Sequence, residues 1–224
     1  MIQNSSPHSR QTPSATLSEV LPGRILLHVC CAPCSGVIIE TLLQEKFLPS
    51  LFFYNPNIVP FQEYELRKRS VIAFAQRVGI PFVDADYDHE AWLERVKGLE
   101  DERERGQRCS VCFNMRLERS ALYAFENKFS VFTTTNGMSP RKDMNQVNDS
   151  GLRAASRYPG LTFWARNWRL NGAVERSMGI SKKEGFYKQL YCGCPFSLKI
   201  ANQNRAARNL PPIEQGTSPE PTHS

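Results

Sequence analysis

Long apolar runs are missing from this sequence. No uninterrupted apolar stretch approaches the roughly 20 residues that a membrane-spanning helix needs. Residues 1–23 are rich in Ser, Thr, Pro and Asn and contain no apolar core of the kind found in signal peptides. We therefore expect a cytoplasmic protein with no membrane partner. Structural disulfides are rare in that compartment, so paired cysteines there are more often metal ligands or redox pairs.

Common nucleotide-binding motifs and histidine clusters are also missing. The chain contains no G-x-x-x-x-G-K-[ST] loop, and no G-x-G-x-x-G follows a predicted strand. Of its four histidines, His8 and His223 lie near the ends of the chain, and His28 lies inside an apolar run. A histidine-based site is therefore poorly supported, and we expect His28 to be a core residue.

Cysteine, in contrast, is abundant and grouped. The seven cysteines form three groups: Cys30-Cys31-Ala32-Pro33-Cys34, Cys109-Ser110-Val111-Cys112 and Cys192-Gly193-Cys194. A single buried cysteine behaves as a small hydrophobic residue, but three thiols within five residues at the exit of a predicted strand are hard to explain by packing. We interpret the three groups as parts of an iron–sulfur redox site.

The first two groups hold enough thiolates for an inorganic centre. A [4Fe–4S] cluster or a zinc ion can be held by four thiolates, supplied here by Cys30, Cys31, Cys109 and Cys112. A turn at Ala32-Pro33 would let the two adjacent cysteines ligate together, and the other two are one helical turn apart. The helices that follow would point their positive N-terminal ends at the thiolates and favour ionisation. Structural zinc is the alternative, while the vicinal pair and the spare cysteines favour iron.

The remaining three cysteines allow several roles. Cys34 is a further metal ligand, a thiol near the substrate, or a small residue in the first turn of a helix. Cys192 and Cys194 are separated by one glycine and can close a small disulfide ring, whose strain would make the bond labile. We interpret them as a redox-active pair. Two more metal ligands or two free thiols are the alternatives.

The positive charge is concentrated in one segment. The net charge is +6 and the pI is near 9.0. Residues 141–188 hold ten Lys or Arg against four Asp or Glu, which accounts for the whole excess. Aromatic residues are interleaved with these charges, and proteins that neutralise phosphates and stack on unpaired bases combine the two in this way. The segment predicts an anionic partner; in the alternative, the aromatic side chains belong to the core and the charges form a solvated face.

Apolar strands alternate with amphipathic helices along the chain. The pattern predicts strands at 24–30, 51–54, 80–83 and 129–135. It predicts helices at 34–46, 62–78, 89–97, 109–125, 146–157 and 194–205, one or two short helices within 173–188, and a charged, exposed connection at 100–108.

This alternation indicates an α/β fold, in which a parallel sheet is flanked by helices and an additional helical part follows at the C-terminal end. Ligands bind beyond the carboxyl ends of such strands, where the first cysteine group lies. With 224 residues, we expect one domain at 24–206 and disordered tails at 1–23 and 207–224.

Several separate blocks of the sequence resemble one known family. The blocks are Leu27-His28-Val29-Cys30-Cys31-Ala32-Pro33, Tyr54-Asn55-Pro56-Asn57-Ile58 with Glu63-Tyr64, Arg108-Cys109 to Cys112 with Arg116-Leu117-Glu118, Thr133-Thr134 with Ser139-Pro140, and Tyr191-Cys192-Gly193-Cys194. In this order, over residues 24–205, they resemble the QueH-type epoxyqueuosine reductases. The combination is much more specific than any single motif.

The resemblance implies a HUP-type fold, related to adenine-nucleotide α-hydrolases, and reduction of epoxyqueuosine to queuosine at the wobble base of tRNA. It implies a [4Fe–4S] cluster on Cys30, Cys31, Cys109 and Cys112, and a redox-active disulfide between Cys192 and Cys194. A second, mononuclear metal is implied for some members, and Cys34 is a candidate ligand for it, although some members have Asp at that position. Where PP-loop relatives carry a Ser-Gly-Gly phosphate loop, this chain has Cys-Cys-Ala-Pro-Cys, which argues against ATP use.

The expected partners are a tRNA bearing epoxyqueuosine and an electron donor that the sequence does not identify. The basic segment 141–188 would hold the anticodon loop, with candidate contacts at Arg141, Lys142, Arg166, Arg169, Lys182 and Lys183. Two other functions compete with this one. They are a zinc-stabilised RNA-binding module without catalysis and a tRNA sulfur-transfer enzyme that uses the same cysteines.

Overall fold

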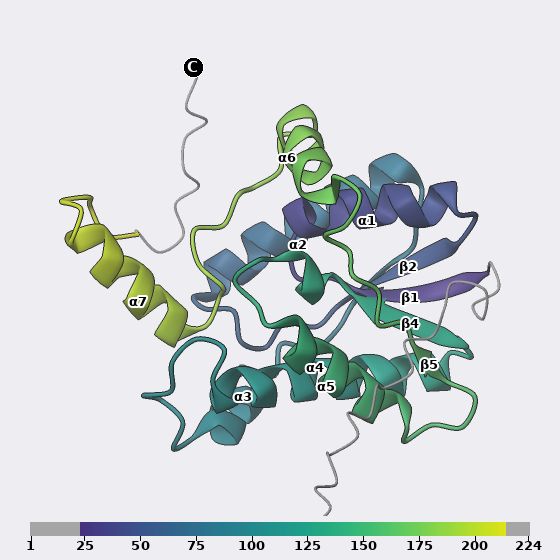
Figure 1. The fold of residues 1–224 in the computed structure, drawn as a ribbon, viewed down its shortest axis with the longest axis horizontal. Coiled ribbons are helices and arrows are strands. Elements are labelled where there is room, and N and C mark those ends of the chain that lie inside the picture. Colours follow the sequence, from purple (N-terminus) through teal and green to yellow (C-terminus); the bar gives the residue numbers. More distant parts are fainter. Residues whose placement is uncertain (1–22, 214–224) are drawn as a thin grey trace, which may run out of the picture.

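The computed structural model describes residues 23–213 and contains a five-stranded parallel sheet between two layers of helices (Figure 1). The strand order is β3-β2-β1-β4-β5, and every neighbouring pair is parallel. The strands are β1 (Arg24–His28), β2 (Leu48–Phe53), β3 (Phe82–Asp84), β4 (Val131–Thr134) and β5 (Thr162–Phe163). The predicted α/β fold with a parallel sheet is confirmed.

The sheet is covered on both faces, which explains its apolar strands. One layer holds α1 (Ala32–Gln44), α2 (Phe61–Val78) and α6 (Ala173–Lys183), and the other holds α3 (His89–Val96), α4 (Gln107–Glu126) and α5 (Met144–Ala155). Side chains alternate along a strand, so Ile25 and Leu27 pack against the first layer and Leu26 against the second. A strand buried on both faces is apolar at every position rather than at every second one.

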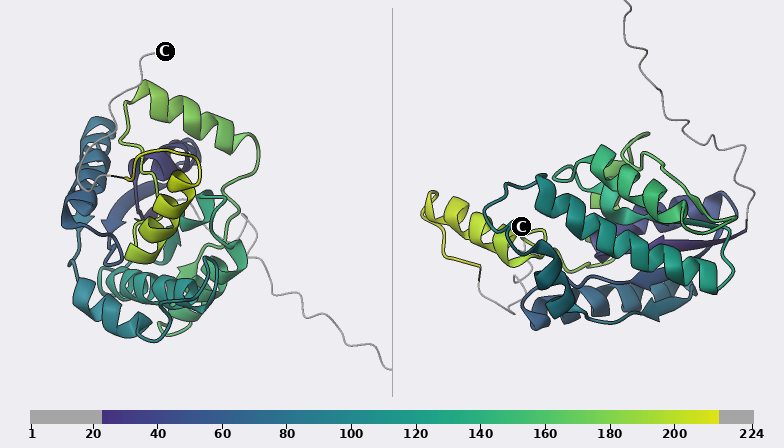
Figure 2. Two further views of the ribbon diagram at one scale, coloured as in Figure 1. Left: turned by 90° about the vertical axis from the view of Figure 1, so that its left-hand side faces the viewer. Right: turned by 90° about the horizontal axis from the view of Figure 1, so that it is seen from below.

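The last helix, α7 (Pro195–Ala206), stands apart from both layers and lies across one end of the sheet (Figure 2). Only Ser197 and Leu198 of this helix are buried. Residues 207–213 fold back along it: the Ile213 backbone N–H donates to Asn202 Oδ1 at 2.8 Å. The predicted tail at 207–224 therefore has contacts over its first seven residues. Its remainder and nearly all of the predicted tail 1–23 lie outside the described residues.

The structure departs from the predicted elements in a few places. β5 has only two residues, too few to show a pattern, and was not predicted. The stretch 100–108 is not wholly exposed, because α4 begins at Gln107 and Arg108 is buried. The Arg108 guanidinium donates to the carbonyls of Leu99 and Glu100 at 3.0 and 2.8 Å, which allows a charged side chain to be buried there.

His28 is a core residue, as predicted. It is fully buried, with Nδ1 2.8 Å from Thr134 Oγ1 and Nε2 3.1 Å from the Tyr54 carbonyl oxygen. Within residues 23–213, no helix is both long and apolar enough to cross a membrane.

Candidate metal and redox centre

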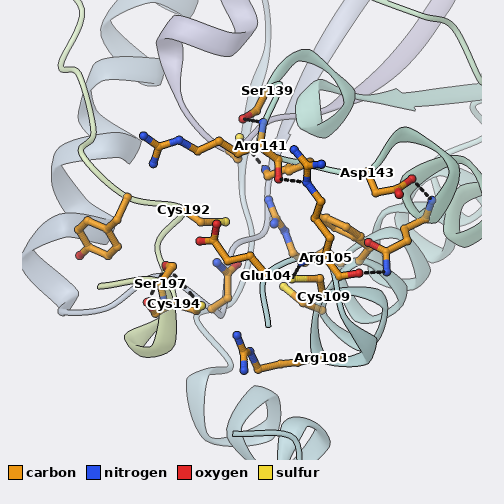
Figure 3. A pocket seen from close by; sticks show the side chains of 18 of the residues that line it. Glu104, Arg105, Arg108, Cys109, Ser139, Arg141, Asp143, Cys192, Cys194 and Ser197 are labelled. Carbon is orange, nitrogen blue, oxygen red and sulfur yellow. Dashed lines mark hydrogen bonds between the residues drawn. The ribbon is translucent and has the colours of Figure 1, made fainter. Parts of the chain in front are cut away.

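A pocket of about 240 Å³ brings the three cysteine groups together (Figure 3). Six of the seven cysteines line it: Cys30, Cys34, Cys109, Cys112, Cys192 and Cys194. Each group sits at the start of a helix. Cys31 is the N-cap of α1, Cys109 lies in the first turn of α4, and Cys194 is the N-cap of α7. Segments that are far apart in the sequence therefore form the walls of one site.

The closest sulfur atoms belong to the first group. The sulfur atoms of Cys30, Cys31 and Cys34 all lie within 4.8 Å of one another, and the first two are 3.8 Å apart. Cys31 is extended (φ −170°, ψ 156°), and the chain turns into α1 directly after it. This trio differs from the predicted set of four ligands. It includes Cys34, whereas Cys109 and Cys112 line the same pocket without joining it.

Within this trio, Cys30 is the cysteine that ionises most readily, and its thiolate is stabilised by the other two thiols. Hydrogen bonds from Cys31 and Cys34 lower the pKa of Cys30 well below its usual value, and the positive charges of Lys142 and Arg116 lower it further. The hydrogen bond to Cys30 raises the pKa of Cys31 to about 12, because Cys31 keeps its proton while donating it. Lys142 Nζ lies 4.0 Å from Cys30 Sγ.

One cysteine in each of the other two groups favours the protonated thiol, although Cys109 lies at a helix N-terminus that we expected to favour ionisation. Burial raises the pKa of Cys109 to about 11 and that of Cys194 to about 12. The backbone N–H groups of Arg105 and Ser197 donate to these sulfur atoms at 3.3 and 3.4 Å, but this favours the thiolate less than burial disfavours it. A metal that binds here would have to displace these protons.

The loop with Cys192 and Cys194 needs a glycine between them. Gly193 has φ +133°, a region that residues with a Cβ rarely adopt. A Cβ at this position would lie 2.9 Å from Ile58 Cγ1 and 3.3 Å from Arg67 Nη1. The Val59 N–H donates to the Gly193 carbonyl at 2.9 Å, so the loop lies tightly against the segment before α2. The sulfur atoms of Cys192 and Cys194 are not bonded to each other in this structure, and both residues are half-buried.

A buried arginine on α2 anchors this loop, and our reading of the sequence missed it. Arg67 donates to the carbonyls of Cys192 and Tyr191 at 2.8 and 3.1 Å. Its charge is balanced by Glu63, one turn earlier, at 2.7 Å. The only signal in the sequence is the spacing of Glu63 and Arg67, which many exposed helix pairs share.

Polar atoms around the pocket indicate that it accepts a polar or charged occupant. Six buried side-chain atoms on residues that line or adjoin it have no hydrogen-bond partner among the described residues: Asn57 Oδ1, Trp92 Nε1, Arg116 Nε, Asn136 Nδ2, Gln146 Oε1 and Gln189 Oε1. Buried polar atoms normally have partners. Gln189 also donates to Cys31 Sγ at 3.0 Å. The thiol donors suit soft metals and iron–sulfur clusters, so the residues present fit such a group.

The six basic residues predicted to contact tRNA do not gather at this pocket. Only Arg141 and Lys142 line it. Arg166 forms a two-pronged ion pair with Glu45, at 2.6 and 2.8 Å. Arg169 donates to backbone carbonyls of Gly137, Ser139 and Lys142. Lys182 and Lys183 are exposed at the end of α6.

The aromatic residues of the basic segment are mostly core residues, so the expectation that they stack on bases is wrong for these side chains. Phe163, Trp164, Trp168 and Phe186 are all buried, with Trp164 only 2% exposed. Trp164 and Trp168 pack against each other, with ring centroids 5.6 Å apart. They cover α1 and the sheet, where the apolar faces of an α/β fold require large side chains.

Comparisons with known proteins agree with this architecture. The profile of the family "Epoxyqueuosine reductase QueH" matches residues 25–200. The epoxyqueuosine reductase QueH of Acinetobacter baylyi is 52% identical over 193 residues, which cover 86% of this chain and 88% of that protein. Its counterpart from Haemophilus influenzae is 49% identical, with 86% and 79% covered. The structure is also similar to that of the U34-tRNA thiolase NcsA from Methanococcus maripaludis, solved with its [4Fe-4S] cluster. The TM-score is 0.51, the identity 11%, and 87% of this chain and 70% of that one are covered. At this identity the likeness concerns the fold alone, and it agrees with the α/β fold built on a parallel sheet.

Proposed function

The chain belongs to the epoxyqueuosine reductase QueH family, and from this premise we propose that it is an iron–sulfur oxidoreductase that reduces epoxyqueuosine to queuosine at the wobble position of tRNA. One observation carries the proposal. Cysteines from three distant segments line a single pocket at the end of a parallel sheet, where such folds bind their ligands.

We assign a [4Fe–4S] cluster to Cys30, Cys31, Cys109 and Cys112, which lie in or beside this pocket. Cys34 is left over from this set of four, and it would hold a second, mononuclear metal ion. Such an ion would lie beside the cluster, because the Cys34 sulfur is within 4.8 Å of those of Cys30 and Cys31. When bound, these groups would supply single electrons and a Lewis acid for the departing oxygen. The positive charges of Lys142 and Arg116 would stabilise the thiolates that such a centre needs.

Cys192 and Cys194 would supply the electron pair. Removing the oxygen of an epoxide takes two electrons and two protons and yields an alkene and water. Two thiols deliver both: their S–H bonds break, one S–S bond forms, and the oxygen leaves as water. Gly193 and Arg67 hold the pair at the pocket wall. An electron donor, still unidentified, would then reduce the disulfide.

The decisive experiment is mass analysis of the nucleosides of epoxyqueuosine-containing tRNA after anaerobic incubation with the reduced, iron-loaded protein. We expect epoxyqueuosine to decrease and queuosine to increase in equal amounts, with a boiled-protein control. Unchanged nucleosides together with a colourless, zinc-containing protein would favour the RNA-binding module. Sulfur in the product nucleoside would favour the sulfur-transfer enzyme.

A further inference from the structure

A second cavity, a groove of about 520 Å³, adjoins the cysteine pocket. It runs between α7 with its folded-back end and the loops at 104–105 and 141. Its lining residues are Glu104, Arg105, Arg141, Leu190, Ser197, Ile200, Ala201, Asn204, Arg205, Arg208, Leu210 and Ile213. Four of them also line the cysteine pocket: Glu104, Arg105, Arg141 and Ser197. Figure 3 shows these four around the thiols, so the groove and the pocket form one continuous surface.

The groove is strongly basic. It contains four arginines and one glutamate, and none of the four arginines forms an ion pair with a carboxylate of the described residues. Two of them are held by the backbone. Arg105 donates to the carbonyls of Pro140 and Arg141 at 2.8 and 3.1 Å, and Arg205 donates to that of Pro211 at 2.6 Å. Their remaining N–H groups stay available for an anion. Arginine is well suited to this because its planar fork matches the oxygens of a phosphate.

The groove also offers apolar surface. Leu190 and Leu210 are 40% and 47% exposed, and Ile200, Ala201 and Ile213 line the same cavity. Apolar side chains beside guanidinium groups are suited to bind a nucleotide. The apolar side chains can contact its flat base and sugar, and the guanidinium groups can bind its charged phosphate. Glu104 lies where the groove meets the pocket, and its carboxylate would keep a phosphate out of the pocket while an uncharged base passes.

We propose that this groove binds the nucleotide that adjoins the modified base in single-stranded RNA, with Arg205 and Arg208 on its phosphate and the leucines under its base. The proposal rests on the proposed function, because it takes the substrate of the cysteine pocket to be a tRNA loop. The basic segment 141–188 contributes only Arg141 to this groove. An acidic electron-donor protein would also attract the arginines, but a concave groove continuous with the substrate pocket favours the strand that enters that pocket.

The test is equilibrium binding of epoxyqueuosine-containing tRNA at several salt concentrations, by fluorescence anisotropy. The variant is Arg205→Gln with Arg208→Gln, and its matched control is Lys46→Gln with Lys128→Gln. The control removes two exposed charges from the loops that lead into β2 and β4, at the opposite edge of the sheet, and neither charge forms an ion pair within residues 23–213. We expect the groove variant to bind about tenfold more weakly at low salt. The slope of log K against log salt should fall in magnitude by about 0.7, the value for one single-strand phosphate contact. The control should retain the wild-type slope.

Turnover separates the alternatives. KM for tRNA should rise while kcat at saturating tRNA and the iron content stay at wild-type values. Unchanged tRNA affinity and slope would overturn the proposal and would leave an acidic partner protein as the occupant of the groove. The single variant Arg208→Gln removes no side-chain hydrogen bond found in the structure, and it should show half the change in slope, so misfolding cannot explain the result. If the wild-type protein binds tRNA but makes no queuosine, the proposed function fails, while the two variants can still be compared.

Discussion

Replacing Arg67 by methionine should both destabilise the fold and release the Cys192–Cys194 loop. The side chains of Arg67 and Glu63 are only 1% and 5% exposed, and the pair is 2.7 Å apart. Methionine fills part of the space but leaves the Glu63 carboxylate buried without its counter-charge. Removing one partner of a buried ion pair costs about 3–5 kcal/mol, a large share of the roughly 5–15 kcal/mol by which proteins are stable. At about 2–4 °C per kcal/mol for a chain of this size, Tm should fall by roughly 6–20 °C.

Urea unfolding and thermal melts measure this loss, and two further variants interpret it. Arg67→Lys keeps the charge but lacks the fork that reaches both loop carbonyls, so we expect a smaller loss of stability with impaired turnover. Arg69→Ala removes an arginine of the same helix whose side chain is 76% exposed, and its free energy of unfolding should change by no more than about 0.5 kcal/mol.

An Arg67→Met protein whose free energy of unfolding lies within about 1 kcal/mol of wild type would refute this reasoning. A buried carboxylate without a counter-charge should destabilise the fold by more than that. The double variant Glu63→Gln with Arg67→Met removes the stranded charge, so it should be more stable than Arg67→Met alone. If it is less stable, the ion pair is not the source of the loss.

Four further predictions concern the cysteine site and the core. Cys109→Ala should lose the iron and the visible absorbance of the anaerobically purified protein; wild-type values of both would contradict the ligand assignment. Cys194→Ser should keep the iron but lose turnover, and normal turnover would remove the dithiol from the reaction. Gly193→Ala should slow turnover and lower Tm, because strain at φ +133° and the close contact with Ile58 each cost about 1–3 kcal/mol; an unchanged melt would show that the loop has room. Burial lowers the pKa of His28 to about 3. Between pH 6.5 and pH 3, His28 therefore binds a proton in the unfolded chain but stays neutral in the folded protein. The free energy of unfolding should then fall by up to about 1.4 kcal/mol per pH unit between pH 6.5 and 3. Urea titrations at pH 7 and 5 test this, and an equal pH dependence in His28→Gln would argue against it.

The sequence allowed the first cysteine group to be placed correctly. A continuous apolar run followed by Ala32-Pro33 predicts a buried strand that turns into a helix, and β1 and α1 have this arrangement. The carboxyl end of β1 is also the edge at which the pocket lies. These features depend on local patterns of polarity, which a sequence displays directly.

Other features depend on which side chain meets which, and a sequence does not display that. A count of charges cannot show that Arg166 forms an ion pair with Glu45, 121 positions away. Nor can it show that Arg169 donates its hydrogen bonds to backbone carbonyls. The same holds for Trp164 and Trp168, whose burial follows from the packing of α6 and α1 rather than from their neighbours in the chain. Arg205 and Arg208 lie outside the basic segment and reach the groove only because α7 crosses the end of the sheet.

The separation of the three cysteine groups along the chain has a consequence for how the protein matures. The last wall of the pocket forms only when α7 docks, so a nascent chain cannot present the whole set of sulfur donors. The four cysteines to which we assign the cluster all precede α7 in the chain, so the proposed cluster site does not need α7, whereas the Cys192–Cys194 pair joins the pocket last. With only two buried residues, α7 is the part of the pocket wall that we expect to open most easily.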